Sequence, residues 1–349
     1  MKKKELLKLL NEVEENGEET QEGQRILLID ALNLFFRNFA ILNMVNPEGV
    51  HIGGLGGFFR SLGALIRQFQ PTSVYVVFDG VGSTTNRKNL LPEYKGNRDT
   101  NKITNWEVFD DYEEEEESKI DQITRIIQYL KTLPVKTVSI NKVEADDIIA
   151  HLSKILPQSE KDVSYIVSSD KDYIQLINNN TLLYRPIEKK LYNKNAVIEK
   201  YNLPAHNFII YKSLMKDTSD NIKGIKGLGE KKLHKLFPEI REKFLTLDDI
   251  FEICEQRLKE HVIYARILQD RERLKTNYKV MDLSKPMIDN NDENYLSEVI
   301  KPRELNFDPK SFLEMYEEDK LGGIIRDVKY WVTDIFENLK TTNNDITNT

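Results

Sequence analysis

Nine acidic residues are notable because several of them lie at or just beyond the ends of apolar, β-like segments. Asp30 follows RILLI, Asp79 follows SVYVVF, and further acids follow VKTVSI and YIVSS. Because an open parallel sheet binds its ligands beyond the carboxyl ends of its strands, acids at those ends are expected to converge. The nine residues are Asp30, Asp79, Glu144, Asp146, Asp147, Asp170, Asp172, Asp217 and Asp220.

A cluster of this kind requires divalent cations. At ~4 Å and an effective dielectric of ~20, each pair of like charges costs roughly 4 kcal/mol, so several ionised carboxylates cannot share a crevice uncompensated. Oxygen ligands with little His or Cys suit Mg²⁺ or Mn²⁺. Each acid alone has an ordinary explanation as a cap, a turn former or a helix start, so the inference rests on their number. The pattern predicts a two-metal nuclease holding two Mg²⁺ ions, for which Mn²⁺ can substitute.

The composition indicates a globular protein of about two domains. The chain has 349 residues, of which 40% are hydrophobic, and its one cysteine, Cys254, cannot form an internal disulfide. The sequence contains no segment resembling a secretory leader and no apolar run near the ~18 residues of a membrane span. We therefore expect a cytoplasmic protein, in the host cytoplasm if the gene is phage-encoded, with no membrane contact.

The net charge of −7 does not exclude a nucleic-acid partner. Without the nine clustered acids the formal charge becomes +2, and basic residues gather in two segments. Lysine and arginine usually meet backbone phosphates, so the distribution of charge matters more than its sum. The first segment contains the predicted nucleic-acid contacts Arg87 and Lys88 together with Lys95 and Arg98, and the second spans residues 212–235.

From Arg25 the chain alternates between apolar strands and amphipathic helices, which predicts an α/β fold with a parallel sheet covered on both faces. Residues 1–24 are polar and are expected to form a flexible tail. Residues 25–195 are expected to form the α/β domain, with a long polar insertion at about 84–118, and residues 196–349 to be helical. The acidic run at 113–117 is interpreted as a solvated face or a disordered segment.

Two further motifs are suited to nucleic acid. In LPEYKGNR, Tyr94 can stack on a base while Lys95 and Arg98 contact phosphates, although the segment could equally be a solvated loop. In KDTSDNIKGIKGLGEKKL, glycines let backbone N–H groups approach a phosphate near a helix start, although a helix–hairpin–helix used only for packing is also possible. The phosphate-binding residues predicted for this second motif are Gly224, Gly227, Gly229, Lys231 and Lys232.

Taken in order, ILLIDALN, VVFDG, LPEYKGNR, VEADDIIA, VSSDKDY and KDTSDNIKGIKGLGEKKL resemble the motifs of the 5′-nuclease (flap endonuclease) superfamily, over residues 25 to about 237. Within it, the chain is more similar to stand-alone bacteriophage enzymes of the RNase H type than to the polymerase-fused bacterial form. The resemblance implies a PIN-like α/β domain with a mostly parallel sheet and a helical arch. It also implies a helix–three-turn–helix near 217–237 and a helical C-terminal region.

The resemblance further implies a role for each motif. All nine acids would hold two Mg²⁺ ions directly or through water, and Lys95 and Arg98 would be catalytic residues beside the scissile phosphate. Gly224, Gly227 and Gly229 would cradle the duplex backbone, where the family often holds a monovalent cation. Two departures are visible. Lys216 stands where a glycine is common, and the acidic stretch at 110–117 opposes threading of a single strand, because like charges repel phosphates.

The implied activity is 5′ to 3′ exonuclease and flap endonuclease hydrolysis at the 5′ ends of RNA primers and DNA flaps, for primer removal in replication. The expected partners are RNA–DNA hybrids, flapped or nicked duplex DNA and a single-stranded DNA-binding protein, and the expected state is a monomer. Two alternatives remain. A PIN-type endoribonuclease would share the acids without needing the glycine motif, and a non-catalytic protein could recognise flaps or junctions.

Overall fold

The computed structural model describes residues 23–98 and 102–347. Residues 1–22 of the predicted tail therefore lie outside the described residues, as do residues 99–101 of the predicted arch. Gln24 already belongs to the fold, because its N–H donates to Asp162 at 2.7 Å and its carbonyl accepts from the N–H of Val163 at 2.8 Å. The α/β domain therefore includes Gln24.

A six-stranded sheet forms the centre of the molecule, with the strand order β3-β2-β1-β4-β5-β6. The strands from β3 to β5 pair in parallel, and β6 pairs antiparallel with β5. This confirms the predicted mostly parallel sheet. The strands are β1 (Arg25–Asp30), β2 (Ser73–Val77), β3 (Lys136–Val138), β4 (Val163–Val167), β5 (Thr181–Arg185) and β6 (Lys190–Tyr192).

The strand order reverses at β1, because β2 lies on one side of it and β4 on the other. In open sheets, the crevice that binds ligands lies beyond the carboxyl ends of the strands at such a point. Strand β1 ends with Asp30, and the chain leaving β4 soon reaches Asp170. The topology thus brings acids that are far apart in the sequence to one edge of the sheet.

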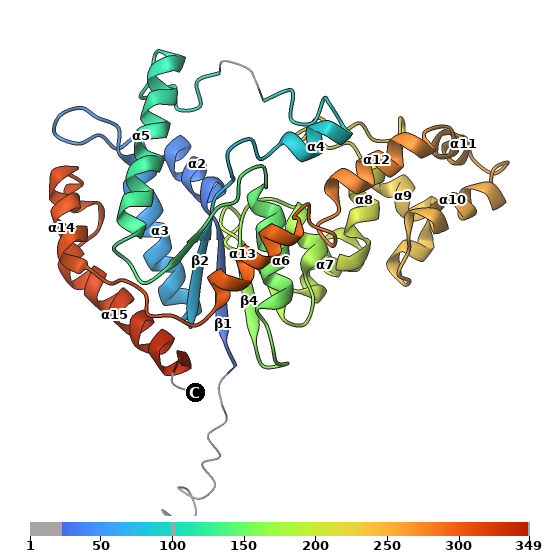
Figure 1. Cartoon of the computed structure of the whole chain (residues 1–349). Coiled ribbons are helices and arrows are strands. Elements are labelled where there is room, and N and C mark those ends of the chain that lie inside the picture. Colours follow the sequence, from blue (N-terminus) through green and yellow to red (C-terminus); the bar gives the residue numbers. More distant parts are fainter. Residues whose placement is uncertain (1–22, 99–101, 348–349) are drawn as a thin grey trace, which may run out of the picture.

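Helices cover both faces of the sheet, and a further helical group extends to one side of it (Figure 1). One apolar core joins the sheet to α2, α3, α5, α14 and α15. A second core joins the other face to α6, α7 and α13. A third apolar cluster lies among α8 to α12. The bounds are α2 (Ala31–Ile41), α3 (Gly53–Phe69), α4 (Thr85–Leu90), α5 (Tyr112–Leu130), α6 (Ala145–Ile155), η1 (Asp172–Leu176), α7 (Lys194–Tyr201), η2 (Ala205–Asn207), α8 (Phe208–Leu214), α9 (Glu230–Leu236), η3 (Pro238–Arg241), α10 (Leu247–Gln256), α11 (Val262–Gln269), α12 (Arg271–Met281), α13 (Asn290–Ile300), α14 (Pro309–Glu318), η4 (Gly322–Ile324) and α15 (Val328–Thr347).

The acidic run at 113–117 forms the start of α5, so it is not disordered; Glu113, Glu114 and Glu117 are exposed, as a solvated face requires, but Glu115 is not. Asp111 caps this helix by accepting hydrogen bonds from the N–H groups of Glu113 and Glu114. Acids in a first turn also stabilise the helix dipole. Glu115 is fully buried and accepts from the N–H groups of Thr104 and Asn105. The run therefore fixes the chain that precedes α5.

The C-terminal helices return to the α/β core, a contact that periodicity alone did not predict. Phe312 of α14 and Trp331 of α15 are buried in the core of the first sheet face. Trp331 lies against Gly63 of α3, where a Cβ atom would come within 2.5 Å of the indole ring. None of the described helices is long and apolar enough to span a membrane.

Candidate metal centre and nucleic-acid interface

Five of the predicted acids line one cavity of about 460 Å³. They come from different elements: Asp30 ends β1, Asp79 follows β2, Asp170 follows β4, and the other two lie at the start of α6. The predicted convergence of acids at the carboxyl edge of the sheet is therefore present for these residues. This first carboxylate group consists of Asp30, Asp79, Glu144, Asp146 and Asp170.

Burial disfavours ionisation of Asp30 and Asp79 in the first carboxylate group. Burial, together with the charge of Asp79, raises the pKa of Asp30 to about 7, even though Asn33 and Ser168 donate hydrogen bonds to it. Burial also raises the pKa of Asp79. Burial would raise the pKa of Glu144 too, but the neighbouring cations of Arg87 and Lys95 lower it overall.

A second carboxylate group consists of Asp172, Asp217 and Asp220, whose oxygens lie within 4.8 Å of one another. Burial raises the pKa of Asp172 to about 7, in spite of an ion pair with Lys212 of α8. Lys212 also pairs with Asp217, and this pair, with hydrogen bonds from Ser219, lowers the pKa of Asp217 to about 2 against the effect of burial. The N–H of Asp172 donates to Asp170 at 2.9 Å, which links the two groups.

Lys212 is a functional candidate that the sequence analysis placed only within a basic segment. Its side chain is 12% exposed, and it lies between two acids of the second group. The signal that could have identified it is a single lysine within the apolar helix sequence FIIYKSL.

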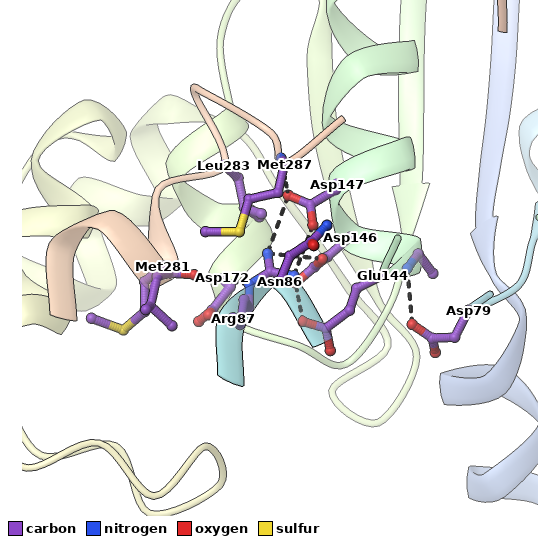
Figure 2. Close-up of polar contacts among 12 residues, drawn as sticks. Asp79, Asn86, Arg87, Glu144, Asp146, Asp147, Asp172, Met281, Leu283 and Met287 are labelled. Carbon is purple, nitrogen blue, oxygen red and sulfur yellow. Dashed lines mark hydrogen bonds and ion pairs between the residues drawn. The ribbon is translucent and has the colours of Figure 1, made fainter. Parts of the chain in front are cut away.

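Arg87 lies inside the site rather than on its surface, which corrects its predicted contact with nucleic acid. Its side chain is 3% exposed, and the guanidinium pairs with Glu144, with Asp146 at 3.1 Å and with Asp147 at 2.8 Å (Figure 2). These carboxylates hold the guanidinium inward, so it cannot meet a phosphate in this conformation. Its neighbour Lys88 is exposed and lines the cavity.

Tyr94 is also buried, which corrects its predicted role as an exposed stacking surface. The residue is 2% exposed, and its hydroxyl donates to Glu144 at 3.2 Å. Lys95 forms an ion pair with the same carboxylate. Arg98 is half-exposed and pairs with Asp220 at 2.9 Å. Lys95 and Arg98 both line the cavity, as expected for residues that contact a bound phosphate.

The LPEYKGNR motif packs against the loop that carries Asp217 and Asp220. The N–H of Lys95 donates to the carbonyl of Asp220 at 3.1 Å, and the side chain of Asn97 donates to the carbonyl of Thr218 at 2.7 Å. Arg98 donates to the carbonyl of Ser219 at 3.2 Å. Two motifs that are more than a hundred residues apart in sequence therefore form one side of the site.

The glycine motif forms the connection between α8 and α9, where the sequence predicted it. Gly227 has a φ of +82°, a left-handed conformation that favours glycine. A Cβ atom at Gly224 would come within 2.4 Å of the backbone of Lys216, whereas Gly229 faces open space. The carbonyls of residues 223 and 226 already accept hydrogen bonds from Asn277 and Arg266. Lys231 and Lys232, at the start of α9, are exposed.

The donor set suits divalent cations. The two carboxylate groups consist of hard oxygen ligands, and burial raises the pKa values of Asp30 and Asp172 in them. The buried Oδ1 atom of Asp146 accepts no hydrogen bond from any described residue, although Arg87 lies 3.1 Å from it. A divalent cation would supply positive charge at these oxygens.

Comparisons with known proteins agree with this geometry. Residues 25–202 match the family model described as the 5′-3′ exonuclease, N-terminal resolvase-like domain. The 5′-3′ exonuclease of Bacillus subtilis (strain 168) is 32% identical over 239 residues, which cover 66% of this chain and 74% of that protein. DNA polymerase I of Lactococcus lactis subsp. cremoris is 32% identical over 265 residues, but these cover 72% of this chain and only 28% of the polymerase.

A solved structure has the same fold. The T5 D15 protein, co-crystallised with metal ions, aligns with a TM-score of 0.62 at 22% identity, and the alignment covers 90% of this chain and 100% of that one. At this identity the likeness establishes the fold alone. The family match and the B. subtilis relative lead to one assignment: the chain belongs to the 5′-nuclease superfamily, among the 5′-3′ exonucleases.

Proposed function

We propose that this chain is a Mg²⁺-dependent nuclease that hydrolyses phosphodiesters at the 5′ ends of RNA primers and DNA flaps held on a duplex. The observation that carries the proposal is the cavity where carboxylates from several strand ends face Lys88, Lys95 and Arg98. The two carboxylate groups would hold two Mg²⁺ ions, for which Mn²⁺ can substitute. Bound ions of this kind lower the pKa of a coordinated water and stabilise the charge on the leaving oxygen.

Lys95 and Arg98 would contact the scissile phosphate and stabilise the charge that develops on it. In the described conformation Lys95 pairs with Glu144 and Arg98 pairs with Asp220. Both cations must therefore exchange a carboxylate partner for the phosphate. Positive charge bound at the carboxylates would favour this exchange, because it would weaken the hold of each acid on its cation.

The glycine motif would hold the duplex next to the cavity. Gly229 and the exposed Lys231 and Lys232 offer backbone N–H groups and cations to phosphates, and a monovalent cation could be held in the same turn. Primer removal in replication, acting as a monomer with a single-stranded DNA-binding protein, is the physiological role that we propose. RNA–DNA hybrids and flapped or nicked duplex DNA are its proposed substrates.

The test is to incubate the protein with three 5′-labelled substrates, in Mg²⁺ and then with a chelator. The substrates are an RNA primer annealed to DNA, a duplex with a 5′ DNA flap, and a free single-stranded RNA. We expect short labelled products from the two duplex substrates only when Mg²⁺ is present. Equal cleavage of the free RNA would favour a PIN-type endoribonuclease. Binding without cleavage, in both Mg²⁺ and Mn²⁺, would contradict the proposal and favour a flap-binding protein.

A further inference from the structure

Asp147 differs from the other eight predicted ligands in where it lies. Five acids line the cavity and three form the second carboxylate group, but Asp147 belongs to neither set in the described part of the chain. Its neighbour Asp146 lines the cavity, and successive residues of a helix point about 100° apart. Asp147 therefore lies on a different side of α6 from Asp146 and does not line the cavity, although the guanidinium of Arg87 contacts both carboxylates.

The carboxylate of Asp147 is already fully engaged by protein donors. It is 2% exposed, and Arg87 donates to its two oxygens at 2.8 and 3.2 Å. The N–H of Met287 donates to Oδ1 at 2.9 Å, as Figure 2 shows. A buried carboxylate that accepts a two-pronged arginine contact and a backbone N–H has little capacity left for a metal ion.

These contacts fasten the segment that leads from α12 to α13, which we call the return segment (residues 280–287). Arg87 donates through Nε to the carbonyl of Val280 at 2.9 Å. Gln175 of η1 donates to the carbonyl of Met281 and accepts from the N–H of Leu283, both at 3.0 Å. The return segment is thus held at its start, middle and end by groups beside the two carboxylate groups.

We propose that Asp147 is a positioning residue and not a metal ligand. With Arg87, it fastens α4 and the return segment to the start of α6. The same guanidinium pairs with Glu144 and Asp146, so the anchor sets where two acids of the cavity lie. If Asp147 turned toward a metal ion, the N–H of Met287 and part of the buried guanidinium would lose their acceptor, which is costly.

The proposal rests on the proposed function in one respect: it assumes that the other acids of the site bind metal ions. The anchor itself is a property of the metal-free protein. It can therefore be tested in a chelator, independently of whether the chain cleaves nucleic acid.

The first experiment measures amide hydrogen exchange of Met287 in the wild-type protein, with a chelator and with saturating Mg²⁺. We expect slow exchange in both conditions, because the acceptor stays in place. Loss of protection on adding Mg²⁺ would show that Asp147 leaves Met287 to bind the ion, and would overturn the proposal. Fast exchange in the chelator would also overturn it, since the anchor would not exist.

The second experiment compares Asp147→Asn with its matched neighbour Asp146→Asn. In a chelator, Asp147→Asn should lower the Tm by about 5–10 °C and speed amide exchange across residues 280–288, because it weakens a buried ion pair. Asp146→Asn should change both much less, since its side chain is 20% exposed and its one contact with the anchor is the ion pair with Arg87 at 3.1 Å. Should Asp147→Asn fail to fold, the wild-type exchange experiment decides.

Counting bound Mn²⁺ ions by electron paramagnetic resonance distinguishes a failure of this proposal about Asp147 from a failure of the proposed function. We expect Asp147→Asn to bind as many ions as the wild type, with weaker affinity, and Asp146→Asn to lose an ion. Loss of an ion in Asp147→Asn, with the return segment still protected, would make Asp147 a ligand. If the wild type bound no Mn²⁺, the proposed function would fail, while the exchange and Tm results would still test the anchor.

Discussion

Two buried cations, Arg87 and Lys212, hold the acidic site together in the absence of metal ions. Arg87 pairs with three acids around the start of α6, and Lys212 pairs with Asp172 and Asp217. Each cation offsets repulsion between carboxylates that have lost contact with water. The pKa of Asp172 nevertheless stays raised, so this compensation is partial.

Replacing Lys212 by methionine should destabilise the metal-free protein. Methionine keeps the length of the side chain but removes the charge that pairs with two buried acids, so we expect a loss of about 2–4 kcal/mol of unfolding free energy in a chelator. Urea denaturation with and without Mg²⁺ measures this loss, and Mg²⁺ should stabilise the variant more than the wild type. Lys216→Met, at an exposed lysine just beyond the end of α8, is the control and should change little. An equal loss in both variants would contradict the role of Lys212.

Asp30 gives a prediction for the effect of pH. Its folded pKa is about 7, while an unfolded aspartate titrates near 3.9. A group with a raised folded pKa contributes stability that is present below about pH 4 and lost as the pH rises through about 7. In a chelator, Asp30→Asn should therefore stabilise the protein by about 4 kcal/mol at pH 8 and by only about 1–2 kcal/mol at pH 5.

Urea denaturation of the wild type and Asp30→Asn at both pH values measures this difference. Titrating histidines are common to the two proteins, so their effect cancels in the comparison. The same gain at pH 5 and at pH 8 would show that the charge of Asp30 is not the cause.

The sequence predicted which residue types form the site, but not which of them are buried. The order and number of the acids were sufficient to place five of them at one cavity. Tyr94 and Arg87 were expected at the surface, because LPEYKGNR and its surroundings look polar and basic. Their burial depends on Glu144 and on Asp147, partners that lie some fifty to sixty residues further along the chain. The local sequence pattern therefore could not show that Arg87 and Tyr94 are buried.

At the scale of elements, Glu115 ties the start of α5 to the chain that precedes it. Glu115→Ala should cost about 2–4 kcal/mol of unfolding free energy, because it leaves the N–H groups of Thr104 and Asn105 without an acceptor. It should also speed proteolysis within residues 102–111. Denaturation by urea and limited digestion measure the two effects. Glu114→Ala, at an exposed neighbour, should be close to neutral; a matching loss there would point to helix charge instead.

The strands could be predicted from the sequence because each is a short apolar run that is followed by polar turn residues. The segments at Arg25–Asp30 and Val163–Val167 are strands in the structure, and TLLYRPIEKKLY forms the hairpin of β5 and β6. Helix α5 begins at Tyr112, inside the segment that was expected to be a polar insertion at about 84–118. A run of glutamates has little apolar periodicity, and its helical state depends on the cap at Asp111 and on the tertiary acceptor at Glu115.

At the scale of the whole molecule, the chain leaves the α/β core and later returns to it. Helices α8 to α12 form their own apolar cluster, whereas α13, α14 and α15 pack on the two faces of the sheet. Periodicity showed that these helices have apolar faces but could not identify the elements they pack against. An apolar helix face in a sequence looks the same whether it packs on the sheet or on another helix. The return segment between the two helical groups lies beside the acidic site.

The net charge of −7 says little about nucleic-acid binding, because the acidic and basic residues lie in different parts of the molecule. The acids gather in the two carboxylate groups and at the start of α5, while Lys88, Lys231 and Lys232 remain exposed. These exposed lysines are available to a nucleic-acid backbone in spite of the negative net charge.

The central claim is that the clustered carboxylates make the chain a metal-dependent nuclease, and Asp170→Asn tests it most directly. Two quantities are measured for this variant: the single-turnover cleavage rate of a 5′-labelled flap duplex and the affinity for the same duplex. Asp170 lines the cavity but is exposed, so its replacement should not disturb folding. A metal-dependent nuclease predicts that cleavage falls by about 10³-fold while the Kd for the duplex changes little. Unchanged cleavage, or an equal loss of cleavage and binding, would contradict the account.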